Sequence, residues 1–341
     1  MSRANAQTPP DAVPESVVDT AERHRRWLRR VCWTGGLLAI ASFLVVIGHS
    51  LYVPWKLQQN DWKLTNGFYV VPPKPNWKPE FAHPSRASVE NVKRVQGNGP
   101  VTKSDIALMR HLPNLKRLWI QQPFYPISND VLAEISRLHQ FEELFLQQVE
   151  LDGGALRTLS ACPSLRHLSL THTSLSDDEL THLPDFGRLT GLNLFQTGSA
   201  GLEHVARCSE LEGLNLDQAR ITDADVPLLA RLPKLRILGL HRTVLTDHGA
   251  RTLVNSCRDL TILTISGNNL TDAVLPDIAS LPALQRLVLM DQPITDDGLR
   301  ELKKCTTLEF LAVQNTKVTA AGIAELQRSN PKLREVQHFT R

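Results

Sequence analysis

Residues 284–302 decide the fold, and they read Leu-Gln-Arg-Leu-Val-Leu-Met-Asp-Gln-Pro-Ile-Thr-Asp-Asp-Gly-Leu-Arg-Glu-Leu. Residues 284–290 place leucines at offsets 0, +3 and +5, which predicts a short strand. The Pro-Ile pair that follows turns the chain. Thr295 then begins a helix, because Leu299 and Leu302 stand three residues apart, which is a helical spacing. One strand and one short helix therefore fit into a unit of about 24 residues.

The same frame recurs along the chain at steps of 22 to 26 residues. It starts at Leu115, Phe141, Leu165, Leu189, Leu211, Leu235, Leu260, Leu284, Leu308 and Leu333. A unit of this size cannot bury its own apolar side, so the units must stack as coils of a solenoid, each adding one strand to a parallel sheet. We predict an α/β solenoid over residues 89–341, with about ten to eleven coils and residues 89–112 as a degenerate first coil. The sheet is expected on the concave side and short helices on the convex side.

Residues 31–53 contain no Asp, Glu, Lys or Arg. As a helix they would extend roughly 34 Å, and a hydrocarbon core is about 30 Å thick, so they predict a transmembrane helix. Five arginines lie just before this segment and two lysines just after it, which predicts a cytoplasmic N-terminus and repeats outside the cytoplasmic membrane. A cleaved signal peptide is the alternative. Anchoring is favoured, because the apolar run is long and the best small-x-small site is residues 48–50.

Two further segments flank this predicted helix. Residues 1–30 combine prolines, small polar residues and the arginine cluster, and predict a disordered basic tail in the cytoplasm. Residues 54–88 hold six prolines and three tryptophans, and predict a stiff stalk that could stretch toward about 100 Å. The same segment could instead fold back as a cap over Trp119 and Phe145, since the terminal coils of solenoids need covering.

Four cysteines occupy one repeated core position. Each stands three residues before a strand frame, where other coils have leucine or phenylalanine, and the four are Cys162, Cys208, Cys257 and Cys305. They fall on alternate coils, so neighbouring thiols should be roughly 9 to 10 Å apart. A disulfide needs alpha carbons within about 7 Å. We expect these four, and Cys32 in the apolar segment, to be unpaired structural thiols that bind no zinc.

Threonine-aspartate pairs recur at offsets +11 and +12 of the frame. They are Thr222-Asp223, Thr246-Asp247, Thr271-Asp272 and Thr295-Asp296, with Ser176-Asp177 as a variant. The hydroxyl can cap the following helix and the carboxylate suits the positive end of its dipole. Ser176 and Glu179 have the spacing of a capping box. A ladder of calcium ligands is the alternative, but calcium needs six or more oxygens, so capping is favoured.

These residues carry a family resemblance. The pattern Leu-x-x-Leu-x-Leu-x-x-Thr/Asn-x-Ile/Leu-Thr-Asp, with cysteine alternating with leucine, resembles leucine-rich repeats of the cysteine-containing class. Such repeats occur in F-box substrate receptors and in many bacterial membrane proteins. The resemblance implies a leucine-rich repeat horseshoe, but it implies little about function, because this solenoid serves many roles. The chain has a predicted membrane segment and a proline-rich stretch where F-box helices would stand, so it is more similar to the bacterial, membrane-anchored proteins.

Alternation along each strand predicts that offsets +2, +4 and +6 face the concave side. Two neighbouring coils near the N-terminus place aromatic rings beside charged residues there, and such groups commonly anchor protein interfaces. This N-terminal patch is Arg117, Trp119, Glu143 and Phe145. A second, more diffuse C-terminal patch is Arg286, Met290 and Phe310. The complete set of expected partner-binding residues adds His167, Asn193, Phe195, Asn215, Asp217 and His241.

Catalytic signals are lacking in the sequence. It contains no GxSxG, HExxH, CxxC or glycine-rich phosphate loop, and its twelve histidines are scattered. His167 and His241 should lie roughly 14 Å apart on the concave face, too far to bind one metal. We expect no enzymatic activity, no metal and no cofactor. The net charge of +3 is too small to indicate a nucleic-acid partner.

The predicted function is that of a membrane-anchored interaction protein. Its concave face is expected to bind a protein or glycan outside the cytoplasmic membrane, while residues 31–53 contact the lipid bilayer. A structural spacer or envelope organiser that assembles with its own kind is the main alternative. A cytoplasmic scaffold that recruits substrates through F-box-like repeats is another, should the topology be inverted.

Overall fold

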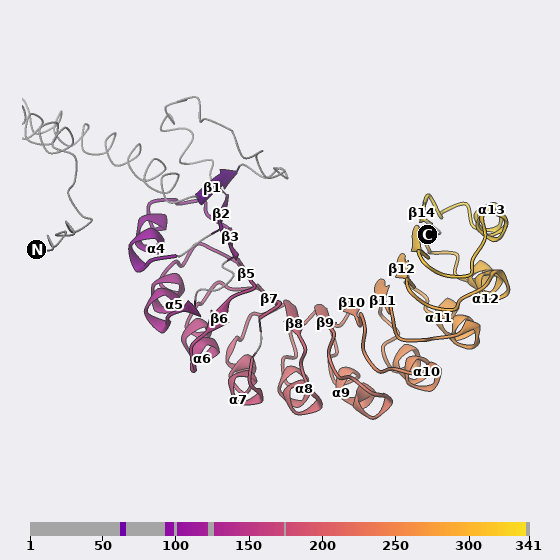
Figure 1. Ribbon diagram of the computed structural model, residues 1–341, viewed down its shortest axis with the longest axis horizontal. Coiled ribbons are helices and arrows are strands. Elements are labelled where there is room, and N and C mark those ends of the chain that lie inside the picture. Colours follow the sequence, from indigo (N-terminus) through magenta and orange to yellow (C-terminus); the bar gives the residue numbers. More distant parts are fainter. Residues whose placement is uncertain (1–61, 66–92, 99–100, 122–125, 174, 339–341) are drawn as a thin grey trace, which may run out of the picture.

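The computed structural model describes residues 62–65, 93–98, 101–121, 126–173 and 175–338, and for residues 62–65 and 97–98 the backbone alone. These residues form a curved solenoid with the sheet on the inside of the curve and the helices on the outside (Figure 1). The first and last coils lie at the two ends of the arc (Figure 1). The α/β solenoid and its leucine-rich horseshoe shape are therefore as predicted.

The main sheet has twelve strands, and from β2 onward each strand pairs in parallel with the next. The parallel strands are β2 (Arg94–Asn98), β3 (Arg117–Gln121), β5 (Glu143–Gln147), β7 (His167–Thr171), β8 (Gly191–Phe195), β9 (Gly213–Asp217), β10 (Ile237–Gly239), β11 (Ile262–Thr264), β12 (Arg286–Val288), β13 (Phe310–Ala312) and β14 (Glu335–Gln337). Strand β1 (Trp62–Thr65) pairs antiparallel with β2 and occupies the N-terminal edge of the sheet. A small second sheet joins β4 (Pro126–Ile127) to β6 (Glu150–Leu151).

Short helices return the chain to the next strand along the convex rim (Figure 1). The α-helices are α4 (Lys103–Met109), α5 (Asn129–Ser136), α6 (Ala155–Ser160), α7 (Asp177–Leu180), α8 (Ser199–Val205), α9 (Val226–Leu229), α10 (Asp247–Ser256), α11 (Leu275–Ala279), α12 (Asp296–Glu301) and α13 (Ala320–Ser329). Single 3₁₀ turns are η1 (Leu183–Asp185), η2 (Asp223–Asp225), η3 (Asp272–Val274) and η4 (Leu302–Lys304). Most α-helices have fewer than nine residues, so their stability comes from packing on the core rather than from helix propensity.

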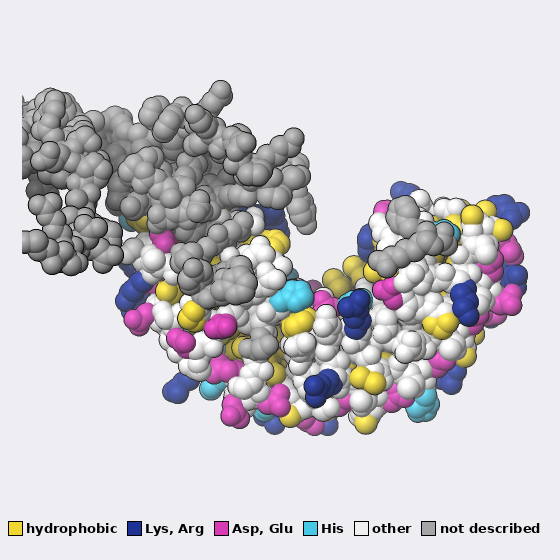
Figure 2. Space-filling model, viewed as in Figure 1, with side chains coloured by type: hydrophobic (Ala, Val, Ile, Leu, Met, Phe, Trp, Pro, Cys, Tyr) yellow, Lys and Arg dark blue, Asp and Glu magenta, His cyan; other side chains and the backbone are white. Residues whose placement is uncertain are grey.

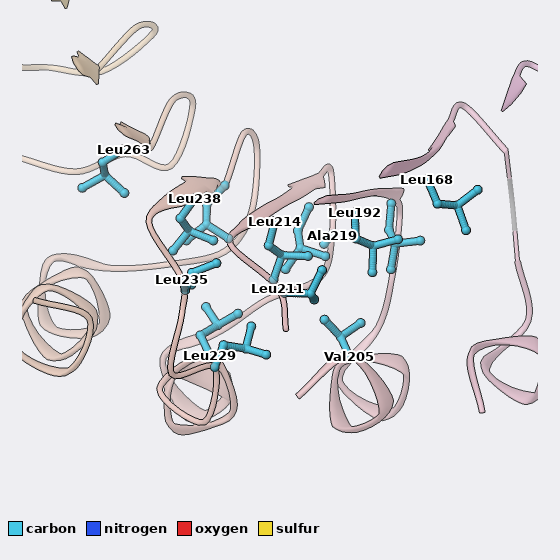
Figure 3. Packing of buried hydrophobic residues seen from close by; sticks show 14 of the residues in the cluster. Leu168, Leu192, Val205, Leu211, Leu214, Ala219, Leu229, Leu235, Leu238 and Leu263 are labelled. Atoms are coloured by element: carbon cyan, nitrogen blue, oxygen red, sulfur yellow. The ribbon is translucent and has the colours of Figure 1, made fainter. Parts of the chain in front are cut away.

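The leucines of the frame form one continuous core between the sheet and the helices. In the coil that begins at Leu211, the side chains of Leu211, Leu214 and Leu216 are at most 1% exposed. Leu229 of helix α9 faces them and is fully buried. Figure 3 shows how leucines from successive strands stack in a row above those of the helices. Truncating one of them to alanine should cost about 2–5 kcal/mol, as for other packed cores.

The threonines of the Thr-Asp pairs cap their helices, as the sequence indicated. Thr246, Thr271 and Thr295 each accept a hydrogen bond from a backbone amide in the first turn that follows, at 3.2, 3.3 and 3.2 Å respectively. One otherwise unpaired donor at each helix start is thereby satisfied.

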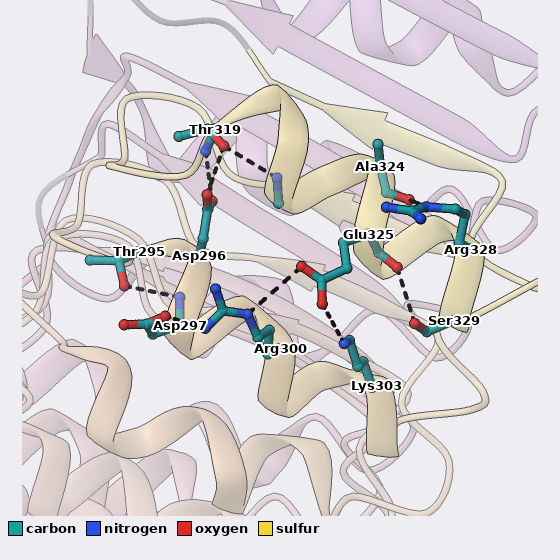
Figure 4. Close-up of polar contacts among 11 residues, drawn as sticks. Thr295, Asp296, Asp297, Arg300, Lys303, Thr319, Ala324, Glu325, Arg328 and Ser329 are labelled. Atoms are coloured by element: carbon teal, nitrogen blue, oxygen red, sulfur yellow. Dashed lines mark hydrogen bonds and ion pairs between the residues drawn. The ribbon is translucent and has the colours of Figure 1, made fainter.

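The aspartates of these pairs have a role that the sequence did not reveal. Asp272 accepts hydrogen bonds from the backbone amide of Thr295 at 2.9 Å and from its hydroxyl at 2.5 Å, one coil further on. The same two bonds join Asp223 to Thr246, Asp247 to Thr271 and Asp296 to Thr319. Figure 4 shows the last of these. We call the series the Asp–Thr ladder, and it links five consecutive coils along the convex rim.

Glycines in the first helical turn make room for the ladder. A Cβ on Gly298 would lie 2.5 Å from Cγ of Asp272, and a Cβ on Gly322 would lie 2.5 Å from Cγ of Asp296. Neither glycine has a positive φ. They are needed because a carboxylate of the preceding coil occupies the space of their side chains.

Ser176 and Glu179 do not form the reciprocal capping box that their spacing suggested. Ser176 does accept a hydrogen bond from the Glu179 amide at 3.3 Å. The Glu179 carboxylate instead accepts from the backbone amides of Gly154 and Leu156 in the preceding coil. Helix α6 begins after Gly154, which has φ of 84° and no side chain, so Glu179 supplies the cap that the coil itself lacks.

The four repeat cysteines are free and buried, which confirms that they are unpaired core residues. Burial raises the pKa of Cys208 and of Cys257 to about 11. Their thiolates are therefore scarce at neutral pH, and the thiols act as small apolar groups rather than as nucleophiles.

The predicted transmembrane helix, residues 31–53, lies outside the described residues, as does the tail of residues 1–30. Within the part of the chain that is described, no helix has both the length and the apolar character needed to cross a bilayer.

Candidate binding surface on the concave sheet

The concave side chains of the parallel strands stand in straight columns because every strand pairs in register with the next. One column runs through Arg94, Arg117, Glu143 and His167, and the column beside it runs through Gln96, Trp119 and Phe145. We call the surface made by these outward side chains of β2 to β14 the concave floor. No described helix covers it, and the space-filling view shows a hollow between the two arms of the solenoid (Figure 2).

The N-terminal patch is assembled as predicted. The rings of Trp119 and Phe145 are stacked, with centroids 5.5 Å apart and planes inclined by 25°. Beside them, Nε of Arg117 lies 2.7 Å from Oε2 of Glu143. Both rings are half-buried. The Nε1 atom of Trp119 is buried, and no described residue offers it a hydrogen-bond acceptor.

Polar residues occupy the next coils of the floor. His167 is exposed, and its ring lies over Gly191, with Nε2 3.1 Å from where a Cβ of that glycine would stand. Asn193 donates a hydrogen bond from Nδ2 to the hydroxyl of Ser169 at 3.3 Å. The glycine in this column thus allows a large imidazole to lie flat on the sheet.

The third group, the Asp217 cluster, surrounds a half-buried carboxylate. It consists of His172, Phe195, Asn215, Asp217 and His241. Burial raises the pKa of Asp217, while His241, His172 and a hydrogen bond from Asn215 oppose that rise without cancelling it. The Asn215 side chain lies over Gly239, where a Cβ would stand 2.9 Å from its Cγ.

The C-terminal patch differs from its prediction in one respect. Phe310 lies in the expected column but is only 6% exposed. The guanidinium of Arg286 covers it, with Cζ 4.0 Å from the ring centroid. Arg286 itself is exposed and Met290 is half-buried, so this patch presents a cation rather than an aromatic ring.

His172 is a member of the floor that the alternation of strand residues missed. Its ring lies 4.5 Å from that of Phe195, at an angle of 56°. It stands at offset +7, where the chain leaves the strand with φ of 54°. The same left-handed conformation recurs at Gln148, Gln196, Gln218, Arg242, Asp291 and Asn315, with φ between 53° and 58°. A polar residue repeated at +7 was the signal that could have identified this row.

Within the described residues, no three or more His, Cys, Asp or Glu side chains converge closely enough to hold a metal ion. The aspartates of the Asp–Thr ladder, the earlier candidates for calcium, bond to threonines instead.

Comparisons with known proteins bear on the fold alone. Neither protein-family models nor curated proteins give a match to this chain. Solved structures do match, and one is an internalin (inlF) from Listeria monocytogenes str. 4b F2365. The two chains share 17% identity with a TM-score of 0.42, and the match covers 74% of this chain and 88% of that one. The solenoid assignment rests on the strand register described above rather than on this likeness.

Proposed function

We propose that this chain is a recognition protein whose concave floor binds a protein partner, with the N-terminal patch as the main contact. The observation that carries the proposal is the stacked pair of Trp119 and Phe145, half-buried on a sheet face that no described helix covers. Large rings fixed by stacking lose little conformational entropy on binding, which is why aromatic residues dominate the energetic centres of interfaces.

The neighbouring charges support this reading. Arg117 and Glu143 pair across adjacent strands at 2.7 Å, so their side chains are held beside the rings and need little reordering when a partner binds. A glycan partner would also use flat rings, but the indole Nε1 of Trp119 is buried and is not presented to a sugar hydroxyl. A protein partner is therefore favoured.

The test is capture of a partner from cells by the full chain. The double variant Trp119→Ser and Phe145→Ser should lose at least about 2 kcal/mol of binding free energy, because hot-spot aromatics typically cost that much. Val244→Ser is the matched control, since Val244 is 60% exposed but lies beyond strand β10, outside the columns of the floor. Equal capture by wild type and double variant would contradict the proposal and favour a structural spacer.

A membrane anchor is a separate part of the proposal. The uncharged run of residues 31–53 and the arginines before it support a single helix with a cytoplasmic N-terminus, which places the repeats outside the cytoplasmic membrane. Protease treatment of intact cells tests this. Digestion of the repeats without lysis is expected, whereas protection until lysis would contradict the proposed topology.

The proposal has two further parts, which concern the class of the repeats and whether the protein is an enzyme. The repeats are proposed to belong to the cysteine-containing class, because four cysteines fill a core position that leucine fills elsewhere, and each is at most 7% exposed. The role is proposed to be binding without catalysis, because the sequence contains none of the common catalytic motifs and the main patch is a stacked ring pair beside the ion pair of Arg117 with Glu143.

A further inference from the structure

Two phenylalanines of the concave floor have a carboxylate directly opposite on the next strand. Phe195 is in register with Asp217, and Phe310 is in register with Glu335. At Phe310, the guanidinium of Arg286 from the preceding coil lies over the ring at 4.0 Å. The chain thus contains one complete case of a cation placed on a ring whose next neighbour is a carboxylate.

At Phe195 the ring contact is made by a histidine and not by an arginine. The residue against that ring is His172, an imidazole with its centroid 4.5 Å away. The titratable side chains that act on Asp217 are His241 and His172, and no lysine or arginine of the described residues is among them. Arg242 follows His241 but leans over Gly267 of the next coil, with Cγ 3.0 Å from where a Cβ of that glycine would lie.

Asp217 is therefore a half-buried carboxylate without a lysine or arginine partner. Its burial disfavours the charged form, and a cation that binds beside it would offset that cost. The neighbouring Phe195 ring is half-buried and offers a face on which a planar cation can stack. Guanidinium matches both features, because its fork pairs with a carboxylate through two hydrogen bonds and its plane stacks on aromatic rings.

We propose that Asp217 and Phe195 form a subsite of the concave floor that binds an arginine side chain of the partner. This inference rests on the proposed function, because it names the chemistry of one group that the partner inserts. The subsite uses the same stacking of a guanidinium on a phenylalanine ring that Arg286 and Phe310 show within the chain, with the guanidinium supplied from outside and the Asp217 carboxylate in register beside the ring.

The experiment is titration of the full chain, purified in detergent, with N-acetyl-arginine amide. Binding is followed through the imidazole carbon-bound proton signals of His172 and His241, which flank the carboxylate. Saturable shifts with a dissociation constant on the order of millimolar are expected for a single anchoring group. N-acetyl-citrulline amide has nearly the same shape without the charge, and it should bind at least about tenfold more weakly.

Three variants make the result specific. Asp217→Asn should abolish the saturable shifts, and Phe195→Leu should weaken binding several-fold while leaving the charge in place. Asp291→Asn is the matched control: it removes the same charge from an exposed aspartate that accepts a hydrogen bond from Asn315 Nδ2 at 2.7 Å, and it should bind as wild type. Equal binding of citrulline, unchanged binding by Asp217→Asn, or saturable shifts with a methyl glycoside in place of arginine would overturn the proposal.

Failure of the arginine subsite can be told apart from failure of the proposed function. If arginine does not bind but partner capture still depends on Trp119 and Phe145, only the subsite is wrong. If arginine binds through Asp217 but capture ignores the two rings, the subsite stands and the main contact is misplaced.

Discussion

The convex rim and the concave floor both carry aspartates, and their surroundings shift the pKa values of these carboxyl groups in opposite directions. Asp296 on the rim accepts two hydrogen bonds from Thr319, and these bonds hold its pKa below the usual value. Asp217 on the floor is half-buried without a lysine or arginine partner, and burial raises its pKa. The rim carboxylates stabilise the stacking of coils, whereas the floor carboxylate costs stability, which is typical of a group kept for a ligand.

The two ends of the solenoid also differ in how regularly their coils repeat. From Asp223 to Thr319 the coils repeat one hydrogen-bond scheme, and strands β10 to β14 have three residues each. In the N-terminal coils, the main-sheet strands β3, β5, β7, β8 and β9 have five residues each, and helix α6 takes its cap from Glu179 of the next coil. The stacked rings of Trp119 and Phe145 lie in this less regular half. The longer strands there present more outward side chains to a partner, whereas the Asp–Thr ladder ties the C-terminal coils to one another.

The largest effect should follow from crowding the ladder. Gly298→Ala places a Cβ 2.5 Å from Cγ of Asp272, so the carboxylate or the helix must shift, and we expect a loss of about 2–3 kcal/mol in the free energy of unfolding. Urea denaturation measures this. Gly187→Ala is the control, since no atom lies within 4 Å of its added Cβ, and it should be nearly neutral.

A double-mutant cycle sharpens that prediction. In an Asp272→Ala background the carboxylate is gone and only the Cβ of residue 272 remains, 2.8 Å from the new Cβ, so Gly298→Ala should cost clearly less than it does in wild type. Additive losses in the cycle would show that the clash with Asp272 is not the reason for the glycine.

Asp272→Ala alone should have the next largest effect. It removes the two bonds to Thr295 and leaves a helix-start amide without its acceptor, so about 1–2 kcal/mol should be lost. Asp291→Ala, which removes one exposed bond to Asn315, should lose less than about 0.5 kcal/mol. Urea midpoints of the two variants provide the comparison, and similar losses in both would argue against a stabilising ladder.

The next largest effect should come from acid, which protonates the aspartates of the ladder and weakens their hydrogen bonds. Hydrogen bonds from Thr319 lower the pKa of Asp296, and those from Thr246 lower that of Asp223 despite some burial. A depressed folded-state pKa gives stability that is present above the unfolded value, about 3.9, and is lost as pH falls through the lower folded value. Thermal midpoints should therefore drop as the pH falls below about 4. The drop should be smaller in Asp296→Asn, which cannot titrate, and an equal drop in that variant would exclude a contribution from Asp296.

Asp217→Asn should have the smallest effect, and it should raise the stability of the fold at neutral pH rather than lower it. A raised folded-state pKa means that stability is lost as pH rises through that value, so the neutral variant should melt about one or two degrees higher than wild type at pH 7. The difference should vanish below about pH 3.5, where both the folded and the unfolded wild type are protonated. A lower melting temperature at pH 7 would mean that the charge of Asp217 supports the fold.

The sequence predicts most of this architecture because leucine spacing sets both the strand register and the face of each side chain. This spacing predicts that Trp119 lies beside Phe145 and Arg117 beside Glu143, and the structure has both pairs in contact. It could not predict contacts that depend on how far one coil is displaced from the next. The bonds of Asp272 to Thr295, the cover of Arg286 over Phe310 and the approach of His172 to Phe195 are all of that kind.

One measurement tests the central claim directly: that recognition belongs to the concave floor and not to the convex rim. A photo-crosslinking amino acid is placed at Phe145 on the floor and, in a second protein, at His248 on the exposed surface of helix α10. We predict a discrete adduct with a protein partner from position 145 and none from position 248. An adduct from position 248 alone would contradict the account.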